Sequence, residues 1–160
     1  MSIEKAVVFL CGTEQYAVPV EQVVSIEKLE RVTSIPHLPN YLLGFTRIRG
    51  ELTPIIDFQT ILYNRPTNTQ TAKIIVLKTE LINYGLVVAD AKEIIDFEEG
   101  VLKQMGLVNY EKTKYFTAVA NLEDRMISCI DPNILVHSLD GIREIIEYLH
   151  EMNQQENQTN

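Results

Sequence analysis

The stretch YLLGFTRIRGELTPIID, residues 41–57, recurs without a gap as YFTAVANLEDRMISCID, residues 115–131. The offset of 74 residues pairs Tyr41 with Tyr115 and Asp57 with Asp131. Upstream, the runs that begin at residues 5 and 16 match those that begin at residues 73 and 84, at an offset of 68. The chain is therefore predicted to contain two copies of one β-rich unit.

The apolar runs of the chain are short and rich in valine and isoleucine, and turn-forming residues separate them, as expected for β-strands. Many short strands at regular spacing are typical of barrels and sandwiches. No apolar run long enough for a buried central helix occurs in the first 130 residues. The predicted strands cover residues 6–10, 16–20, 23–26, 42–49, 52–56, 74–77, 84–88, 93–97, 116–122 and 126–130.

The segments between and after the two copies have other patterns. Residues 63–72 are polar and contain a proline, so they are predicted to form a loop between the copies. Residues 100–114 fit either a short helix or an irregular loop. Near the C-terminus, Ile142, Ile145, Ile146 and Leu149 recur at helical spacing, which predicts an amphipathic helix within 137–152. The polar residues 153–160 are expected to be a disordered tail.

The composition favours a packed, acidic protein. Hydrophobic residues make up 46% of the 160 residues, and 14 lysines and arginines against 22 aspartates and glutamates give a net charge of −8. Because the basic surface typical of nucleic-acid-binding proteins is absent, nucleic acid is not expected as a partner. The apolar run at the N-terminus is shorter than a signal peptide or membrane helix requires, so a cytoplasmic protein without direct membrane insertion is expected.

Asp57 and Asp131 occupy the same position in the two copies, directly after a predicted strand and before a short helical pattern. An aspartate at a helix N-cap accepts a hydrogen bond from an orphan backbone N–H, and Pro132 is tolerated at the first helical position. Both aspartates are therefore predicted to be structural caps rather than catalytic carboxylates.

The two copies differ in charge at a predicted hairpin, where the first has Arg47, Arg49 and Gly50 and the second has asparagine, glutamate and aspartate. Alternation along a strand predicts that Arg47 and Arg49 point the same way, with Gly50 in a tight turn. One interpretation is an ordinary solvated strand and turn. The other is a cationic edge that binds a carboxylate of a partner, for which the two-pronged guanidinium is well suited.

No catalytic constellation is found in the sequence. It has no G-x-S-x-G elbow, no GxxxxGK[ST] phosphate loop, no HExxH and no cysteine–histidine cluster. The three histidines, His37, His137 and His150, are scattered. Cys11 and Cys129 lie in apolar strands and are predicted to be buried free thiols. A protein that is not an enzyme and has no cofactor or metal is therefore expected.

The order and spacing of two motifs resemble one known family. YAVPVEQVVSI (16–26), followed by GFTRIRGELTPIID (44–57), is similar to the pattern of the CheW family of bacterial chemotaxis coupling proteins, and the similarity spans about residues 3–136. Gly44 matches the leading glycine of that pattern, and Arg49 and Gly50 match its Arg-Gly pair. The chain departs from the pattern at Arg47, which replaces an asparagine, and at Ser25, which replaces an acidic residue.

Val23 and Ile26 match apolar positions upstream in the same pattern. Apolar residues in such strands usually belong to the core. The alternative is that two lobes pack side by side and that these residues line a groove between them.

The resemblance implies an all-β fold of two SH3-like five-stranded β-barrel subdomains, related by the internal duplication, with a C-terminal α-helix. The expected boundaries are a single CheW-like domain over residues 1–152, with one barrel at about 14–70. The other barrel would span about 73–136 together with the N-terminal strand 3–11. The helix would lie within 137–152 and the tail at 153–160, while the exchange of strands between barrels is left open.

The resemblance also implies a non-catalytic adaptor that couples the cytoplasmic tips of chemoreceptors, the methyl-accepting proteins, to the regulatory domain of a sensor histidine kinase. Such an adaptor is recruited to membrane-associated receptor arrays, where a groove between the barrels binds the receptor tip and the barrel ends meet the kinase. The alternative is a CheW-like coupling module of another kinase pathway, such as surface motility or development. The expected partner-binding residues are Val23, Ile26, Gly44, Arg47, Arg49 and Gly50.

Overall fold

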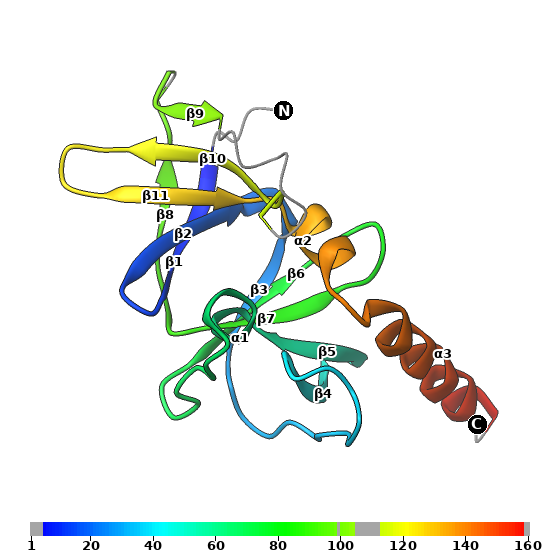
Figure 1. Cartoon of the computed structure of the whole chain (residues 1–160). Coiled ribbons are helices and arrows are strands. Elements are labelled where there is room, and N and C mark those ends of the chain that lie inside the picture. The colour runs from blue at the N-terminus through cyan, green and yellow to red at the C-terminus, as the bar shows by residue number, and fades with distance from the viewer. Residues whose placement is uncertain (1–4, 99, 105–112, 159–160) are drawn as a thin grey trace.

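The computed structural model describes residues 5–98, 100–104 and 113–158. These residues form eleven strands and three α-helices, with one short 3-10 turn (Figure 1). In chain order the elements are β1 (Lys5–Cys11), β2 (Glu14–Pro19), η1 (Val20–Gln22), β3 (Val23–Lys28), β4 (Leu42–Ile48), β5 (Glu51–Asp57), α1 (Phe58–Tyr63), β6 (Lys73–Leu77), β7 (Tyr84–Val88), β8 (Asp90–Asp96), β9 (Leu102–Gln104), β10 (Phe116–Asn121), β11 (Met126–Ile130), α2 (Pro132–Ser138) and α3 (Ile142–Gln158).

The strands form two sheets, which we call barrel 1 and barrel 2. Barrel 1 has five strands in the order β3-β6-β7-β5-β4, and barrel 2 has six in the order β8-β1-β2-β11-β10-β9. The two sheets lie next to each other, and α3 extends from the side of barrel 1 (Figure 1). The predicted all-β fold of two small barrels with a C-terminal helix is confirmed. Barrel 2 has a sixth strand because β9 forms within the segment whose structure the sequence left open.

The two barrels match strand for strand. Each strand of barrel 1 has its repeat partner at the same place in barrel 2, since β3, β6, β7, β5 and β4 correspond to β8, β1, β2, β11 and β10. The register is also shared: Ile55 pairs with Gly85 in barrel 1, and their repeat partners Cys129 and Ala17 pair in barrel 2. Both of these pairings are parallel. The internal duplication is therefore present in three dimensions.

The copies exchange strands, and the boundaries expected from the sequence need correction. Barrel 1 combines residues 23–57 with residues 73–88, whereas barrel 2 combines residues 5–19 with residues 90–130. The expected division at about residue 70 placed β2 in barrel 1 and β6 and β7 in barrel 2, whereas each belongs to the other barrel. Instead, the parallel pairings β2–β11 and β5–β7 join a hairpin of one copy to a hairpin of the other. Strand pairing at such sequence separation is not encoded in any local stretch of sequence.

One large core joins the two barrels. Phe9 and Val18 of barrel 2 pack in the same cluster as Ile75 and Leu86 of barrel 1, and Ile145 of α3 belongs to it as well. Each barrel also has a smaller apolar interior of its own. Because burial of apolar surface is the main favourable contribution to folding, the shared core makes the two barrels one structural unit.

Helix α3 packs on barrel 1 through the predicted apolar stripe. Ile142, Ile145 and Leu149 are buried, and the Tyr148 ring lies 5.0 Å from the Phe45 ring of barrel 1. The helix continues beyond Met152 to Gln158, so a tail that is disordered throughout 153–160 is wrong for its first six residues. Glutamine and glutamate are good helix formers, and a helix that is already docked extends at little cost.

Candidate functional site

The β4–β5 hairpin has a strained tip. Ile48 pairs with Glu51, so Arg49 and Gly50 alone form the turn, and both have positive φ, 53° and 84° respectively. This is the geometry of a type I′ turn, which favours asparagine or aspartate followed by glycine. Arginine at the first position costs about 1 kcal/mol or more, because its Cβ crowds the backbone in the left-handed region. Because such strain is often found at functional sites, the Arg49 side chain is a candidate for binding a partner.

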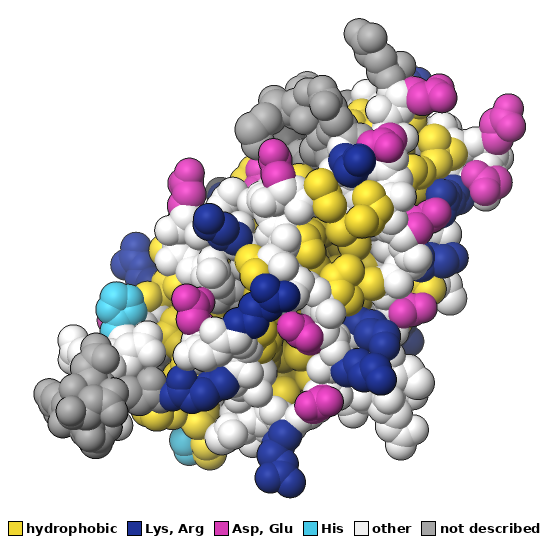
Figure 2. Space-filling view, turned by 180° about the vertical axis from the view of Figure 1, so that it is seen from behind, with side chains coloured by type: hydrophobic (Ala, Val, Ile, Leu, Met, Phe, Trp, Pro, Cys, Tyr) yellow, Lys and Arg dark blue, Asp and Glu magenta, His cyan; other side chains and the backbone are white. Residues whose placement is uncertain are grey.

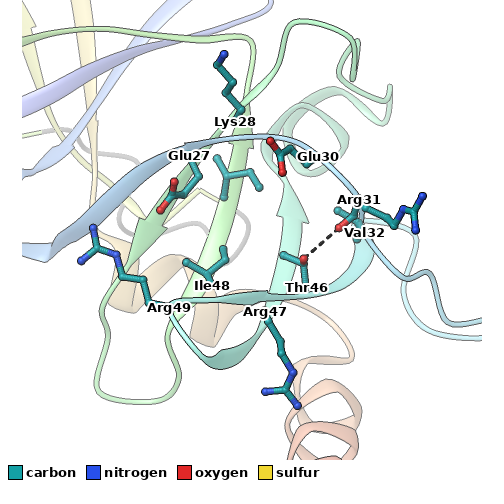
Figure 3. A pocket seen from close by; sticks show the side chains of 10 residues that line it. Glu27, Lys28, Glu30, Arg31, Val32, Thr46, Arg47, Ile48 and Arg49 are labelled. Atoms are coloured by element: carbon teal, nitrogen blue, oxygen red, sulfur yellow. Dashed lines mark hydrogen bonds between the residues drawn. The ribbon is translucent and has the colours of Figure 1, made fainter.

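Arg47 and Arg49 do not share one face of the strand, as alternation predicted. Arg49 belongs to the turn, where the strand periodicity no longer applies, and its side chain points away from that of Arg47 (Figure 3). The Arg47 guanidinium donates a hydrogen bond of 3.2 Å to the Gly50 carbonyl oxygen. The Arg47 side chain therefore stabilises the turn through its hydrogen bond to the backbone, whereas the Arg49 side chain lies at the tip of the hairpin.

The hairpin borders a hollow of about 360 Å³ between β4 and the chain that leaves β3 (Figure 3). The hollow combines apolar side chains with both signs of charge, and four of its charged residues are basic, against two acidic ones. Thr46 Oγ1 donates to the Arg31 carbonyl oxygen at 3.0 Å and ties the two walls together. The lining residues are Glu27, Lys28, Glu30, Arg31, Val32, Thr46, Arg47, Ile48, Arg49 and Ile74.

A second hollow, of about 370 Å³, lies on the other side of the hairpin, next to α3. Arg47, Gly50 and Glu51 line it from the hairpin, and Leu149 and Asn153 line it from the helix. Arg47 thus borders both hollows. Asn153, the first residue of α3 beyond Met152, contributes to the wall that the helix forms here.

Gly44 has a structural rather than a contact role. It is buried, so its predicted part in partner binding would be indirect, through the position of the neighbouring backbone. Its φ is 146°, and β4 shifts register against β5 between Leu42 and Gly44. Phe45 and Thr33 exchange two backbone hydrogen bonds next to this bulge. Because Gly44 has no Cβ, the segment that contains Arg31 and Thr33 can lie close to the hairpin.

Val23 and Ile26 lie on β3, one of the two edge strands of barrel 1. Val23 packs partly against the shared core, whereas Ile26 is 44% exposed. The repeat partner of Ile26 is Ile94 on β8, an edge strand of barrel 2, and it is 61% exposed. Seen from behind, hydrophobic side chains gather in the middle of the molecule with charged side chains around them (Figure 2). Both edges thus present apolar side chains to solvent.

The residue that departs from the acidic family position, Ser25, also lies on β3. Its Oγ is shielded from solvent and has no hydrogen-bond partner among the described residues. In barrel 2 the repeat partner of Ser25 is Glu93, which forms an ion pair with Arg125. At this position the polar side chain therefore has an internal partner in barrel 2, whereas the polar side chain in barrel 1 has none among the described residues.

Asp57 and Asp131 are N-caps of α1 and α2. The Asp57 side chain accepts from the Gln59 N–H, and that of Asp131 accepts from the N–H groups of Asn133 and Ile134. Asp57 has additional donors, because Thr60 Oγ1 and the Thr67 N–H lie 2.9 and 2.8 Å from its carboxylate and the Thr67 hydroxyl donates to it as well. Asp57 therefore also fastens the loop between α1 and β6.

The described residues contain no arrangement that points to catalysis. Cys11 and Cys129 are buried and free. Burial raises the pKa of each thiol to about 12, and Asp57 acts in the same direction on Cys11. No group of three histidine, cysteine or acidic side chains that could hold a metal occurs within the described ranges. None of the helices in the described part of the chain is long and apolar enough to cross a bilayer.

Sequence reasoning missed two of the basic residues at the hollow. Lys28 and Arg31 lie beyond the apolar part of β3, and their spacing from Arg49 in sequence gives no sign of proximity. The mixed charges of residues 27–31 predict a solvent-exposed polar segment, but they do not predict that the segment lies near the hairpin. The bridge between Thr33 and Phe45 brings that segment to the hairpin.

Comparison with known proteins gives one family. The family model described as CheW-like domain matches residues 5–140. The chain is 30% identical over 136 residues to the chemotaxis protein CheW of Bacillus subtilis (strain 168), covering 83% of this chain and 86% of that protein. It is 25% identical over 137 residues to the chemotaxis protein CheW of Klebsiella aerogenes, covering 84% and 82%. The crystal structure of the scaffolding protein TtCheW from Thermoanaerobacter tengcongensis superimposes with a TM-score of 0.76 at 25% identity, over 88% of this chain and 96% of that chain.

Proposed function

The chain belongs to the family of CheW-like domains, and on that basis we propose that it is a non-catalytic coupling adaptor of chemotaxis. In this role it links the cytoplasmic tips of chemoreceptors to the regulatory domain of a sensor histidine kinase, and it is recruited from the cytoplasm to receptor arrays. The relatives named chemotaxis protein CheW cover most of the chain, and they support the adaptor role.

The observation that carries the proposal is the strained arginine at the hairpin tip. Arg49 occupies a turn position that asparagine would fill at lower cost, and it stands beside a hollow with further basic residues. On a protein of net charge −8 this is a local concentration of positive charge. An acidic segment of the kinase regulatory domain fits it, because guanidinium groups bind carboxylates with two hydrogen bonds.

The receptor tip is assigned to the apolar edge strands. Ile26 on β3 and Ile94 on β8 are exposed, although large aliphatic side chains normally lie in the core. A helical receptor tip that presents apolar side chains between polar ones would cover both. The adaptor then needs only to bind two partners at once, and no chemical step is required of it.

A reconstitution experiment tests this proposal. The purified protein is mixed with a receptor signalling fragment and the kinase, and kinase autophosphorylation and co-sedimentation are measured. The parent protein should raise phosphorylation in the presence of receptor. Arg49→Ala should weaken kinase binding about tenfold, corresponding to the ~1.4 kcal/mol of a modest charge-assisted contact.

Matched controls separate the sites. Arg143→Ala removes another exposed arginine, on α3, and should leave kinase binding unchanged. Ile26→Ser should weaken sedimentation with the receptor fragment and leave kinase binding intact. A parent protein that binds both partners without raising phosphorylation would favour a coupling module of another kinase pathway. Binding to neither partner would refute the adaptor role.

A further inference from the structure

In each barrel one strand leads directly into a short helix that contacts the other barrel. Helix α1 follows β5 of barrel 1, and its Phe58 ring lies 5.6 Å from Phe9 and 5.2 Å from Tyr16, both of barrel 2. Helix α2 follows β11 of barrel 2, and its Asn133 Oδ1 accepts from the Glu80 N–H of barrel 1. The two helices therefore form reciprocal connections between the barrels.

Two tyrosines at equivalent positions bridge these connections. Tyr16 of β2 and Tyr84 of β7 are 68 residues apart, which is the offset of the repeat. The Tyr16 hydroxyl lies 2.8 Å from the hydroxyl of Tyr63, the last residue of α1. The Tyr84 hydroxyl donates to the carbonyl oxygen of Pro132, the first residue of α2, at 3.0 Å. Each bond runs from a strand of one barrel to the helix that directly follows a strand of the other barrel.

The two bonds differ in their exposure to water. Tyr84 is fully buried, whereas Tyr63 is 43% exposed. Burial raises the pKa of both Tyr16 and Tyr84 above the ordinary value of a phenol, so both hydroxyls stay protonated across the physiological range. The shared apolar core holds the barrels together without direction, since apolar contacts are not directional. Hydrogen bonds add directional constraints to the close packing of the core.

We propose that Tyr16 and Tyr84 are positioning residues that set the angle between the two barrels, and with it the spacing between the edge strands β3 and β8. Those strands carry the exposed Ile26 and Ile94, one on each barrel. The inference rests on the proposed function in one respect: a receptor tip that touches both edges requires a fixed spacing between them. The kinase site at the Arg49 hairpin lies within barrel 1 and does not depend on the angle.

The first test measures the angle without any partner. Lys28→Cys on β3 and Lys92→Cys on β8 place one exposed label site on each edge strand, and electron paramagnetic resonance gives the distance distribution between spin labels. Cys11 and Cys129 are buried and should stay unlabelled in the native protein. Tyr16→Phe, Tyr63→Phe and Tyr84→Phe should each shift or broaden the distribution. The first two delete the same hydrogen bond and should give the same result.

The second test uses binding. The three variants, with both lysines restored, should bind the receptor fragment about fivefold more weakly and bind the kinase regulatory domain within twofold of the parent. Tyr148→Phe is the control, since the Tyr148 hydroxyl makes no hydrogen bond among the described residues while its ring packs on Phe45. General loss of stability would weaken both interactions, so the selective loss is the diagnostic result.

The outcomes separate the two proposals. Unchanged distance distributions in all three variants, or changes equal to those of Tyr148→Phe, would refute the positioning role. A parent protein that binds no receptor fragment would instead refute the proposed function, and the distance measurement would still decide the positioning role. Altered distances with unchanged receptor affinity would confirm the positioning role and would refute the claim that the receptor tip requires a fixed spacing between the edge strands.

Discussion

A Cβ atom on Gly44 would stand 2.0 Å from the carbonyl oxygen of Thr33. The neighbouring residue, Phe45, exchanges two backbone hydrogen bonds with Thr33, at 2.9 and 3.0 Å, so the two segments are held at this close distance. The contact brings Arg31, two residues before Thr33, to the hollow beside the hairpin. Glycine is thus required at this position by a neighbouring backbone as well as by its own φ.

Gly44→Ala should therefore lower the free energy of unfolding by at least ~3 kcal/mol, because backbone must move to admit the methyl group. Gly50→Ala is the matched comparison. Gly50 also has positive φ, but nothing lies within 4 Å of a Cβ there, so only the ~1 kcal/mol of left-handed strain is expected. Urea denaturation of both variants measures the difference, and equal losses would contradict the steric account.

Arg49→Asn should make the protein more stable and the adaptor weaker. Asparagine suits the first position of a type I′ turn, so a gain of about 0.5–1 kcal/mol in unfolding free energy is expected. Loss of the guanidinium should reduce kinase activation at the same time. Thermal denaturation and the reconstituted phosphorylation assay measure the two effects. A variant that is destabilised would show that the tip is not strained in the parent.

Asp57→Asn should be more damaging than Asp131→Asn. Both residues cap a helix, yet Asp57 is 1% exposed and also accepts two hydrogen bonds from Thr67. In asparagine an NH₂ group replaces one of the two acceptor oxygens. At least one of the present donors would then lie opposite another donor, and its hydrogen bond would be lost. Losses of about 3 kcal/mol for Asp57→Asn and about 1 kcal/mol for Asp131→Asn are expected from denaturant titrations. The internal repeat makes each variant the control for the other.

Alkaline pH should destabilise the protein through its two thiols. Burial raises the pKa of Cys11 and Cys129 to about 12 in the folded state, whereas a thiol in the unfolded chain ionises at about 8.5. Stability is therefore fully present below about pH 8.5, and it falls as pH rises toward 12, by ~1.4 kcal/mol per pH unit for each thiol. Denaturant titrations between pH 7 and 10 measure this slope. The double variant Cys11→Ala and Cys129→Ala should have a much flatter profile over that range.

The two halves of α3 should contribute unequally to stability. Ile145 is fully buried in the shared core, and Ile145→Ala should cost about 2–4 kcal/mol. A chain that ends at Met152 keeps the buried face of the helix and removes the exposed side chains of residues 153–155, so it should lose less than ~0.5 kcal/mol. Calorimetry of both variants tests the division. A large loss on truncation would show that the extension supports the fold.

Features that depend on neighbouring residues could be read from the sequence. The strands followed from apolar runs between turns, and the capping role of Asp57 and Asp131 followed from an aspartate between a strand and a helical pattern. The apolar face of α3 followed from the spacing of Ile142, Ile145 and Leu149. In each case the interaction lies within one element or between adjacent elements, so local spacing is sufficient evidence.

The repeat itself established that the fold is a duplication, but the tertiary structure alone decided how the copies combine. The parallel pairs Ile55–Gly85 and Cys129–Ala17 join segments far apart in the chain, and they put hairpins of different copies into one barrel. The separate bridge between Thr33 and Phe45 brings Arg31 to the hollow that Arg49 also lines. Sequence patterns determine which face of each strand or helix is apolar. Which other element packs against that face depends on the one overall arrangement in which all apolar faces are buried together.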